Sequence, residues 1–191
     1  VIDPVLHFKN AAGSQVENIA IETVDAAPGG LGILMENSDR FRIVNTRVSN
    51  HQSGFLIVRS SNGRIEDCQV YGSTGWTTGD FMIAAGIGLV IGRNNFLTGN
   101  EVTGQTWGVF ASGKNGIIRN NYFHDNSTGL ILCTFPKNYF ELPGGETLGA
   151  EYSAHNWKVL NNETADNSGT GILVIDGANA NVLIDNNSHD N

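Results

Sequence analysis

The sequence predicts an all-β fold, a single parallel β-solenoid of about seven coils that takes in residues 1–191 and carries two long loop insertions. Three observations predict it: a unit of 21 or 22 residues returns along nearly the whole chain, short β-branched runs occur without a sustained 3.6-residue period, and 24 of the 191 residues are glycine. Units with strands but no helix can bury their apolar sides only by stacking on their own copies. Each strand should therefore pair in parallel with its equivalent one coil away.

Each unit begins at a glycine that is followed by apolar residues at the first and third positions. The glycines of this column are Gly32, Gly54, Gly86, Gly108, Gly129 and Gly171. About eleven residues later comes an apolar residue, two spacers, a small polar residue, one spacer and a mostly apolar residue; these halves begin at Ile43, Ile65, Leu97, Ile118 and Val159. A partial unit, Ile19-x-x-Glu22-x-Val24, precedes them, and Ile184-x-x-Asn187 closes the series.

The small polar position is expected to form a ladder at one corner of the solenoid. It holds Thr46, Cys68, Asn100, Asn121, Asn162 and Asn187. Stacked asparagine side chains can hydrogen-bond one another and the backbone of the turn. Since Cys133 falls three coils away from Cys68, both cysteines are expected to be free thiols.

The alternate residues of the glycine strands should point outward, and they too are mostly apolar. This outward stripe includes Leu34, Leu56, Phe110, Ile131 and Leu173. In a soluble protein such a stripe is expected to be covered by the chain's own loops or by a partner. The second half of the unit instead places arginine, lysine and glutamate outward, which is typical of a solvated face.

The two insertions, at about residues 72–85 and 134–156, flank the same strand column and are expected to wall a cleft over the stripe. Aromatic rings beside acids suit sugar binding, which gives the candidate substrate-binding residues Trp76, Asp80, Phe110, Tyr139 and Glu141. The candidate catalytic residues supply a base and a cation that would offset a uronate charge: Tyr152, His155 and Lys137. A simpler alternative is that the aromatic residues only close the loops onto the stripe.

Through the glycine column and the apolar-x-x-Asn halves, the chain resembles the right-handed parallel β-helix proteins of the pectate-lyase-like superfamily over residues 16–191. The resemblance implies the fold, and a membership that runs from polysaccharide lyases, polygalacturonases and uronan epimerases to phage tailspikes and structural surface proteins. The Asp-Asp pair and Gly-His-Gly of polygalacturonases are absent, and only Glu36 supplies an outward acid of the kind that a calcium-dependent lyase needs. No zinc-type spacing occurs, so no cofactor is expected; calcium is the one metal that the fold would allow, and the sequence does not support it.

Two functions from different classes remain open. The first is a secreted or cell-surface module, extracellular or in the cell envelope, that is structural or binds a polysaccharide or another protein subunit along the stripe. The alternative is a polysaccharide lyase or C5-epimerase that acts on a uronan in the cleft. A net charge of −8 argues against a nucleic-acid partner, and the longest low-polarity run, residues 81–92, is too short to span a bilayer. Both ends resemble open coil edges, so the chain is expected to be a segment of a longer one or to associate through its edges.

Overall fold

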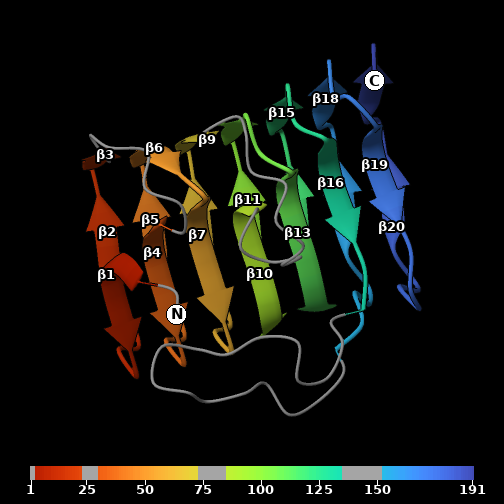
Figure 1. The fold of residues 1–191 in the computed structure, drawn as a ribbon. Helices are drawn as coiled ribbons and strands as arrows, with labels where there is room; N and C mark the ends of the chain where they lie inside the picture. The colour runs from red at the N-terminus through yellow and green to blue at the C-terminus, as the bar shows by residue number, and fades with distance from the viewer. Residues whose placement is uncertain (1–2, 23–29, 73–84, 135–151) are drawn as a thin grey trace.

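The computed structural model describes residues 3–22, 30–72, 85–134 and 152–191, and within them every regular element is a β-strand. The strands form three sheets of seven parallel strands each (Figure 1). The first sheet contains β1 (Asp3–Lys9), β4 (Gly30–Glu36), β7 (Ser53–Val58), β10 (Ala85–Arg93), β13 (Trp107–Lys114), β16 (Thr128–Leu132) and β19 (Thr170–Val174). The second contains β2 (Gln15–Glu17), β5 (Arg42–Val44), β8 (Arg64–Glu66), β11 (Phe96–Thr98), β14 (Ile117–Arg119), β17 (Lys158–Leu160) and β20 (Val182–Ile184). The third contains β3 (Ala20–Glu22), β6 (Arg47–His51), β9 (Gln69–Gly72), β12 (Glu101–Thr103), β15 (Tyr122–His124), β18 (Glu163–Ala165) and β21 (Asn187–His189). Each coil gives one strand to each sheet, which confirms the predicted seven-coil solenoid.

The second half of each unit is bent into two short strands, one in the second sheet and one in the third. At the bend, the residue before the ladder position has a positive φ, as at Asn45 (45°), Asp67 (53°), Asn120 (54°) and Asn161 (51°). Asparagine and aspartate enter this left-handed region more readily than other non-glycine residues. These residues therefore turn the chain through the corner, where the ladder position was expected to lie.

The inward residues of the glycine strands build the main core, as predicted. Equivalent residues of successive coils pair across the first sheet and are fully buried: Ile33, Phe55, Ile87, Val109 and Leu130. Val174 was also expected to point inward, but it is 41% exposed. It belongs to the seventh coil, which packs on only one neighbouring coil.

Two large aromatic side chains fill space left by glycines one coil away. A Cβ atom at Gly63 would lie 2.0 Å from Cε1 of Phe41, and a Cβ atom at Gly116 would lie 2.0 Å from Cζ3 of Trp157. Both rings are 1% exposed, and the Trp157 indole also donates a hydrogen bond to the Gly113 carbonyl at 3.1 Å. The glycines are therefore required by packing against the adjacent coil.

The asparagine ladder is present and buried. The Oδ1 atom of Asn121 accepts hydrogen bonds from both the backbone N and the Nδ2 of Asn100, each at 2.9 Å. Asn162 receives the same pair from Asn121, at 3.1 and 2.8 Å, and Asn186 receives it from Asn162, at 3.0 and 2.9 Å. A second ladder at the next corner links Asn126 to Asn167 and Asn167 to Asn191 in the same way.

The predicted register is wrong at both ends of the chain. Leu183 pairs with Val159, so the last ladder residue is Asn186, one residue before the predicted Asn187. Val16 pairs with Ile43, so the first unit begins three residues before the predicted Ile19. Both segments contain more than one apolar residue that could occupy the inward position, and the ladder hydrogen bonds and strand pairing decide between them.

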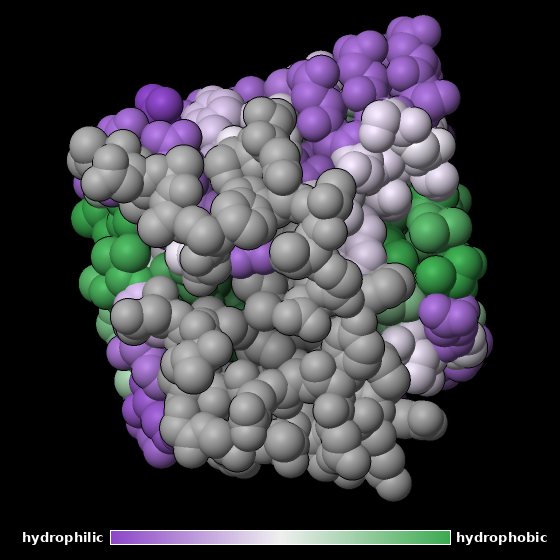
Figure 2. Space-filling model, viewed as in Figure 1, coloured by the Kyte–Doolittle hydropathy of each residue, from purple (hydrophilic) through white to green (hydrophobic). Residues whose placement is uncertain are grey.

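The exposed apolar side chains of the described residues are concentrated in the first and seventh coils. They include Val5 at 58%, Leu183 at 44% and Ile184 at 49%. Figure 2 shows apolar surface near β1 and near β19 and β20, and polar surface at the end of the molecule that carries β18 and β21. No helix that could cross a membrane occurs in the described parts of the chain.

Candidate functional site

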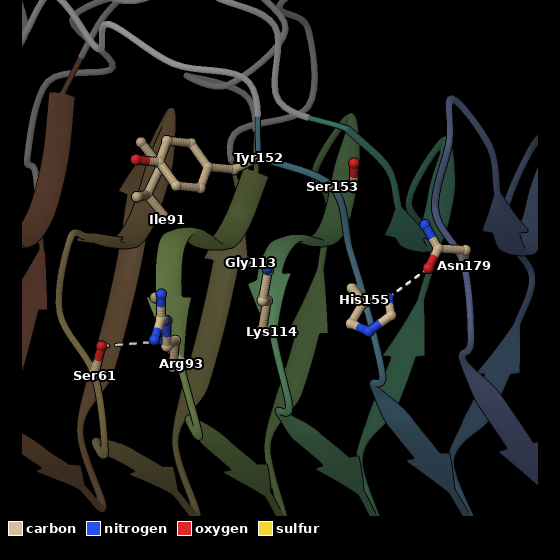
Figure 3. Close-up of a pocket in the computed structure, with 10 residues that line it drawn as sticks. Ser61, Ile91, Arg93, Gly113, Lys114, Tyr152, Ser153, His155 and Asn179 are labelled. Carbon is tan, nitrogen blue, oxygen red and sulfur yellow. Dashed lines mark hydrogen bonds between the residues drawn. The ribbon is translucent and has the colours of Figure 1, made fainter.

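A cleft of about 460 Å³ lies at the corner that follows β10 and β13, between the first and second sheets. Its floor comes from the ends of these two strands, and Tyr152 and His155 complete its wall (Figure 3). Residues from several coils thus meet at one place, although they span more than one hundred positions of sequence.

Basic side chains form a row along one side of this cleft. Arg93 pairs with Lys114 in the first sheet, Lys114 forms a parallel bridge with His155, and His155 forms another with Asn179. These residues belong to consecutive coils, so the spacing along the solenoid is about 4.8 Å per step. Figure 3 shows the row crossing successive coils. We call Arg93, Lys114 and His155 the basic row; its arginine and lysine place two positive charges on adjacent coils of a protein whose net charge is −8.

Hydrogen bonds with the neighbouring coils hold the basic row in place. The backbone N of Arg93 donates to Oγ of Ser61 at 3.1 Å, and the backbone N of His155 donates to the Gly113 carbonyl at 2.9 Å. The His155 ring bonds through Nδ1 to Oδ1 of Asn179. Because an amide oxygen accepts, Nδ1 carries the proton, and Nε2 of a neutral His155 ring is the nitrogen able to accept one.

The other side of the cleft carries two apolar side chains beside Ser153. Ile91 and Tyr152 line it, and both side chains also pack against the buried outer cluster formed by the stripe. Ile91 has a φ of 60°, a left-handed conformation that is a clear outlier for a β-branched residue. This left-handed conformation costs about 1–2 kcal/mol relative to an ordinary backbone conformation.

The structure brings together two of the three predicted catalytic residues. Tyr152 and His155 line the same cleft, whereas Lys137 lies outside the described residues. Four of the predicted substrate-binding residues, Trp76, Asp80, Tyr139 and Glu141, also lie outside them.

The fifth predicted substrate-binding residue, Phe110, belongs to the outer cluster. Its ring stacks on Trp107 with a centroid distance of 5.7 Å and is 2% exposed, so it is not available to a ligand in the described conformation. The outward stripe exists as predicted, but it is buried from Leu34 to Ile131 and only half-buried at Leu173.

Sequence reasoning missed Arg93 and Lys114. A signal was present: Arg93-Asn94, Lys114-Asn115 and His155-Asn156 are three basic-Asn pairs, and each asparagine has a φ between 55° and 58°. The same turn therefore places a basic residue in the same row on three successive coils.

Glu36, the outward acid noted in the sequence, lies on the second coil and outside this cleft. It is fully buried and pairs with Lys9 (Nζ to Oε1, 3.0 Å) and His7 (Nε2 to Oε2, 3.0 Å). In the part of the chain that the structure describes, no three His, Cys, Asp or Glu side chains gather in a way that could hold a metal ion.

Solved β-helix structures superimpose on this chain. A variant of the tailspike protein of E. coli bacteriophage HK620, in complex with a pentasaccharide, superimposes with a TM-score of 0.59 at 15% identity, over 95% of this chain and 35% of the tailspike chain. The A-module of the Azotobacter vinelandii mannuronan C-5 epimerase AlgE4 gives a TM-score of 0.50 at 15% identity, over 98% of this chain and 54% of the module. No curated protein matches the sequence. At this identity the likeness concerns the fold, and the chain spans about a third of the tailspike and about half of the epimerase module.

A family description, "Right handed beta helix region", matches residues 5–191, nearly the whole sequence. Three parallel seven-stranded sheets with buried asparagine ladders agree with it. The chain belongs to the right-handed β-helix family.

Proposed function

We propose that this chain is a polysaccharide-binding β-helix module of an extracellular or cell-envelope protein, and that its ligand is an acidic polysaccharide that lies in the cleft along the basic row. The observation that carries the proposal is the alignment of Arg93, Lys114 and His155 at one side chain per coil. A polymer with an acidic group on each sugar offers charges at a regular interval, and a row of basic side chains at one per coil, with Arg93 and Lys114 as its cations, complements them.

The apolar side of the cleft supports a sugar ligand as well. A tyrosine ring can cover the apolar face of a pyranose while its hydroxyl remains available for hydrogen bonds. Tyr152 is half-buried and lies across the cleft from the basic row (Figure 3). Together these groups would recognise both the charge and the ring of an acidic sugar.

Affinity electrophoresis in gels that contain polygalacturonate, alginate or neutral dextran tests this function. The wild-type chain should be retarded by an acidic polymer and not by dextran. The double variant Arg93→Gln, Lys114→Gln should bind at least about tenfold more weakly, because each charge-assisted hydrogen bond contributes about 1.5–3 kcal/mol. Arg42→Gln is the matched control, since Arg42 lies in the second sheet and pairs with Glu17 at 2.7 Å. Equal retardation of the double variant and the wild type would refute the role of the row.

A second function, uronan lyase or C5-epimerase, is favoured by the presence of Tyr152 and His155 in the same cleft as two cations. In either reaction a base takes the C5 proton of a uronate while a nearby cation stabilises the charge that develops on the carboxylate. Elimination of the O4 leaving group, with a proton returned to O4, gives the lyase product. Return of a proton to the opposite face of C5 gives the epimer.

Nuclear magnetic resonance of polymer incubated in deuterated water separates these outcomes. An epimerase incorporates deuterium at C5, and a lyase produces unsaturated uronate ends. Activity that survives in the double variant Tyr152→Phe, His155→Gln would rule out these residues as the bases. Polymer that binds the wild-type protein but remains chemically unchanged would exclude the lyase and epimerase reactions and support binding as the function.

A further inference from the structure

Ile91 occupies a turn position that the three preceding coils fill with residues better suited to it. The residues at the same register with a positive φ are Asn10 (54°), Asn37 (49°) and Arg59 (49°). Towards the next coil the register shifts between Leu89 and Gly92, so Gly92 pairs with Gly113 and Ile91 lies within the shift. None of the three residues on the preceding coils is β-branched, and a β-branched residue is the poorest choice for a left-handed conformation. Backbone strain of this kind persists where the surrounding structure uses it, often at a ligand site.

The strained position lies at the cleft. Ile91 lines it with Tyr152, and Figure 3 shows both side chains at the same end, away from Lys114 and His155. The Ile91 side chain is half-buried and packs on the outer cluster, and its backbone N donates to Oγ of Ser112 at 3.4 Å. At this turn an asparagine would place a polar group in the cleft, and a glycine would place no side chain there. The isoleucine supplies a branched apolar surface beside the basic row.

We propose that Ile91 and Tyr152 form a subsite for the methyl of an acyl substituent, such as an O-acetyl group, on an acidic polysaccharide whose carboxylates bind the basic row. The inference rests on the proposed function. A flat aromatic ring matches a sugar face, whereas an aliphatic branch next to that ring matches a methyl group. A methyl ester would offer the same methyl, but it would remove the carboxylate charge that the row binds, so the acyl group is the substituent that satisfies both sides of the cleft.

Matched polymers test the subsite. Alginate and polygalacturonate are each compared with an O-acetylated preparation of the same length and charge by affinity electrophoresis, and a partly methyl-esterified polygalacturonate is included. Wild-type protein should bind at least one acetylated polymer about tenfold more tightly than its unacetylated form, as expected for a filled small apolar pocket. Ile91→Asn should lose this preference, so that the acetylated and unacetylated forms of a polymer bind it with equal affinity.

The outcomes separate this inference from the function on which it rests. Binding to none of the polymers would refute the acidic ligand and the subsite together. Binding without a preference for acetyl, a preference that survives in Ile91→Asn, or a stronger preference for the methyl ester would overturn the subsite and leave the acidic ligand in place.

Thermal unfolding decides whether Ile91 is present only for packing. Relief of backbone strain should offset the lost apolar contact, so Ile91→Asn should melt no lower than the wild type. Asn37→Ile places the same strain at the same turn, two coils away from Ile91 and outside the cleft. It should lower Tm by about 2–8 °C and leave polymer binding unchanged. A Tm of Ile91→Asn several degrees below that of the wild type would show that Ile91 serves the core, and would overturn the proposal.

Discussion

Replacing Asn121 with leucine should lower the free energy of unfolding by about 3 kcal/mol. Asn121 is 3% exposed, and its Oδ1 accepts two hydrogen bonds from Asn100, one from the backbone N and one from Nδ2. Leucine has nearly the same shape but accepts neither, so two buried donors lose their partner. Each such loss costs about 1–3 kcal/mol, and the apolar burial of leucine offsets part of the sum.

The Asn121 side chain also donates, through Nδ2, to Oδ1 of Asn162 at 2.8 Å and to the Arg119 carbonyl at 3.0 Å. The Asn162 oxygen keeps its bond from the Asn121 backbone, at 3.1 Å, so it is not left without a partner. The penalty therefore comes from the two lost bonds to Asn100 and from the Leu97 and Arg119 carbonyls, which lose the Asn121 Nδ2 donor.

Thermal unfolding followed by circular dichroism measures the effect. For a chain of this length a loss of about 3 kcal/mol should lower Tm by about 6–12 °C. The control is Asn187→Leu, which changes an exposed asparagine one residue after the last ladder position. It should alter the free energy of unfolding by less than about 0.5 kcal/mol. If Asn121→Leu melts like the wild type, or if the two variants are equally damaging, then the buried ladder does not stabilise the protein as described.

Three further predictions follow from buried or paired groups. Gly116→Ala should cost about 1–3 kcal/mol by urea unfolding, because its Cβ would lie 2.0 Å from a buried tryptophan ring; an unchanged midpoint would contradict that packing. Burial raises the pKa of Cys68 to about 11 and that of Cys133 to about 12, so iodoacetamide at about pH 8 should modify neither thiol in the folded protein and both after denaturation; fast labelling of the native protein would argue against their burial. A hydrogen bond from Nδ1 to Asp190 raises the pKa of His189. This pair therefore stabilises the fold fully below the ordinary histidine pKa, and the stabilisation is lost as the pH rises through the raised pKa of His189. In His189→Gln, Tm should fall less than in the wild type between these two pKa values, and an identical dependence of Tm on pH would disprove the linkage.

The solenoid could be predicted because its determinants repeat. The glycines, the alternating apolar residues and the ladder asparagines recur at nearly fixed spacing, and each pattern can be read within one coil. The strand register could not be predicted where a unit contains two apolar residues in a row, as at Leu183 and Ile184. There the inward residue was selected by pairing with Val159 on the preceding coil, which a single unit does not contain.

The cleft was decided by the tertiary structure. The sequence supplied Tyr152 and His155 as candidates and contained the three basic-Asn pairs, but 21 residues separate Arg93 from Lys114 and 41 separate Lys114 from His155. Both intervals nevertheless correspond to one coil along the solenoid, because an insertion lengthens the chain between Lys114 and His155 without adding a coil. Parallel pairing between neighbouring strands sets which residues line up. The amino-acid order therefore determined that coils form and stack, and the stacking alone determined that Arg93, Lys114 and His155 stand in one row opposite Ile91 and Tyr152.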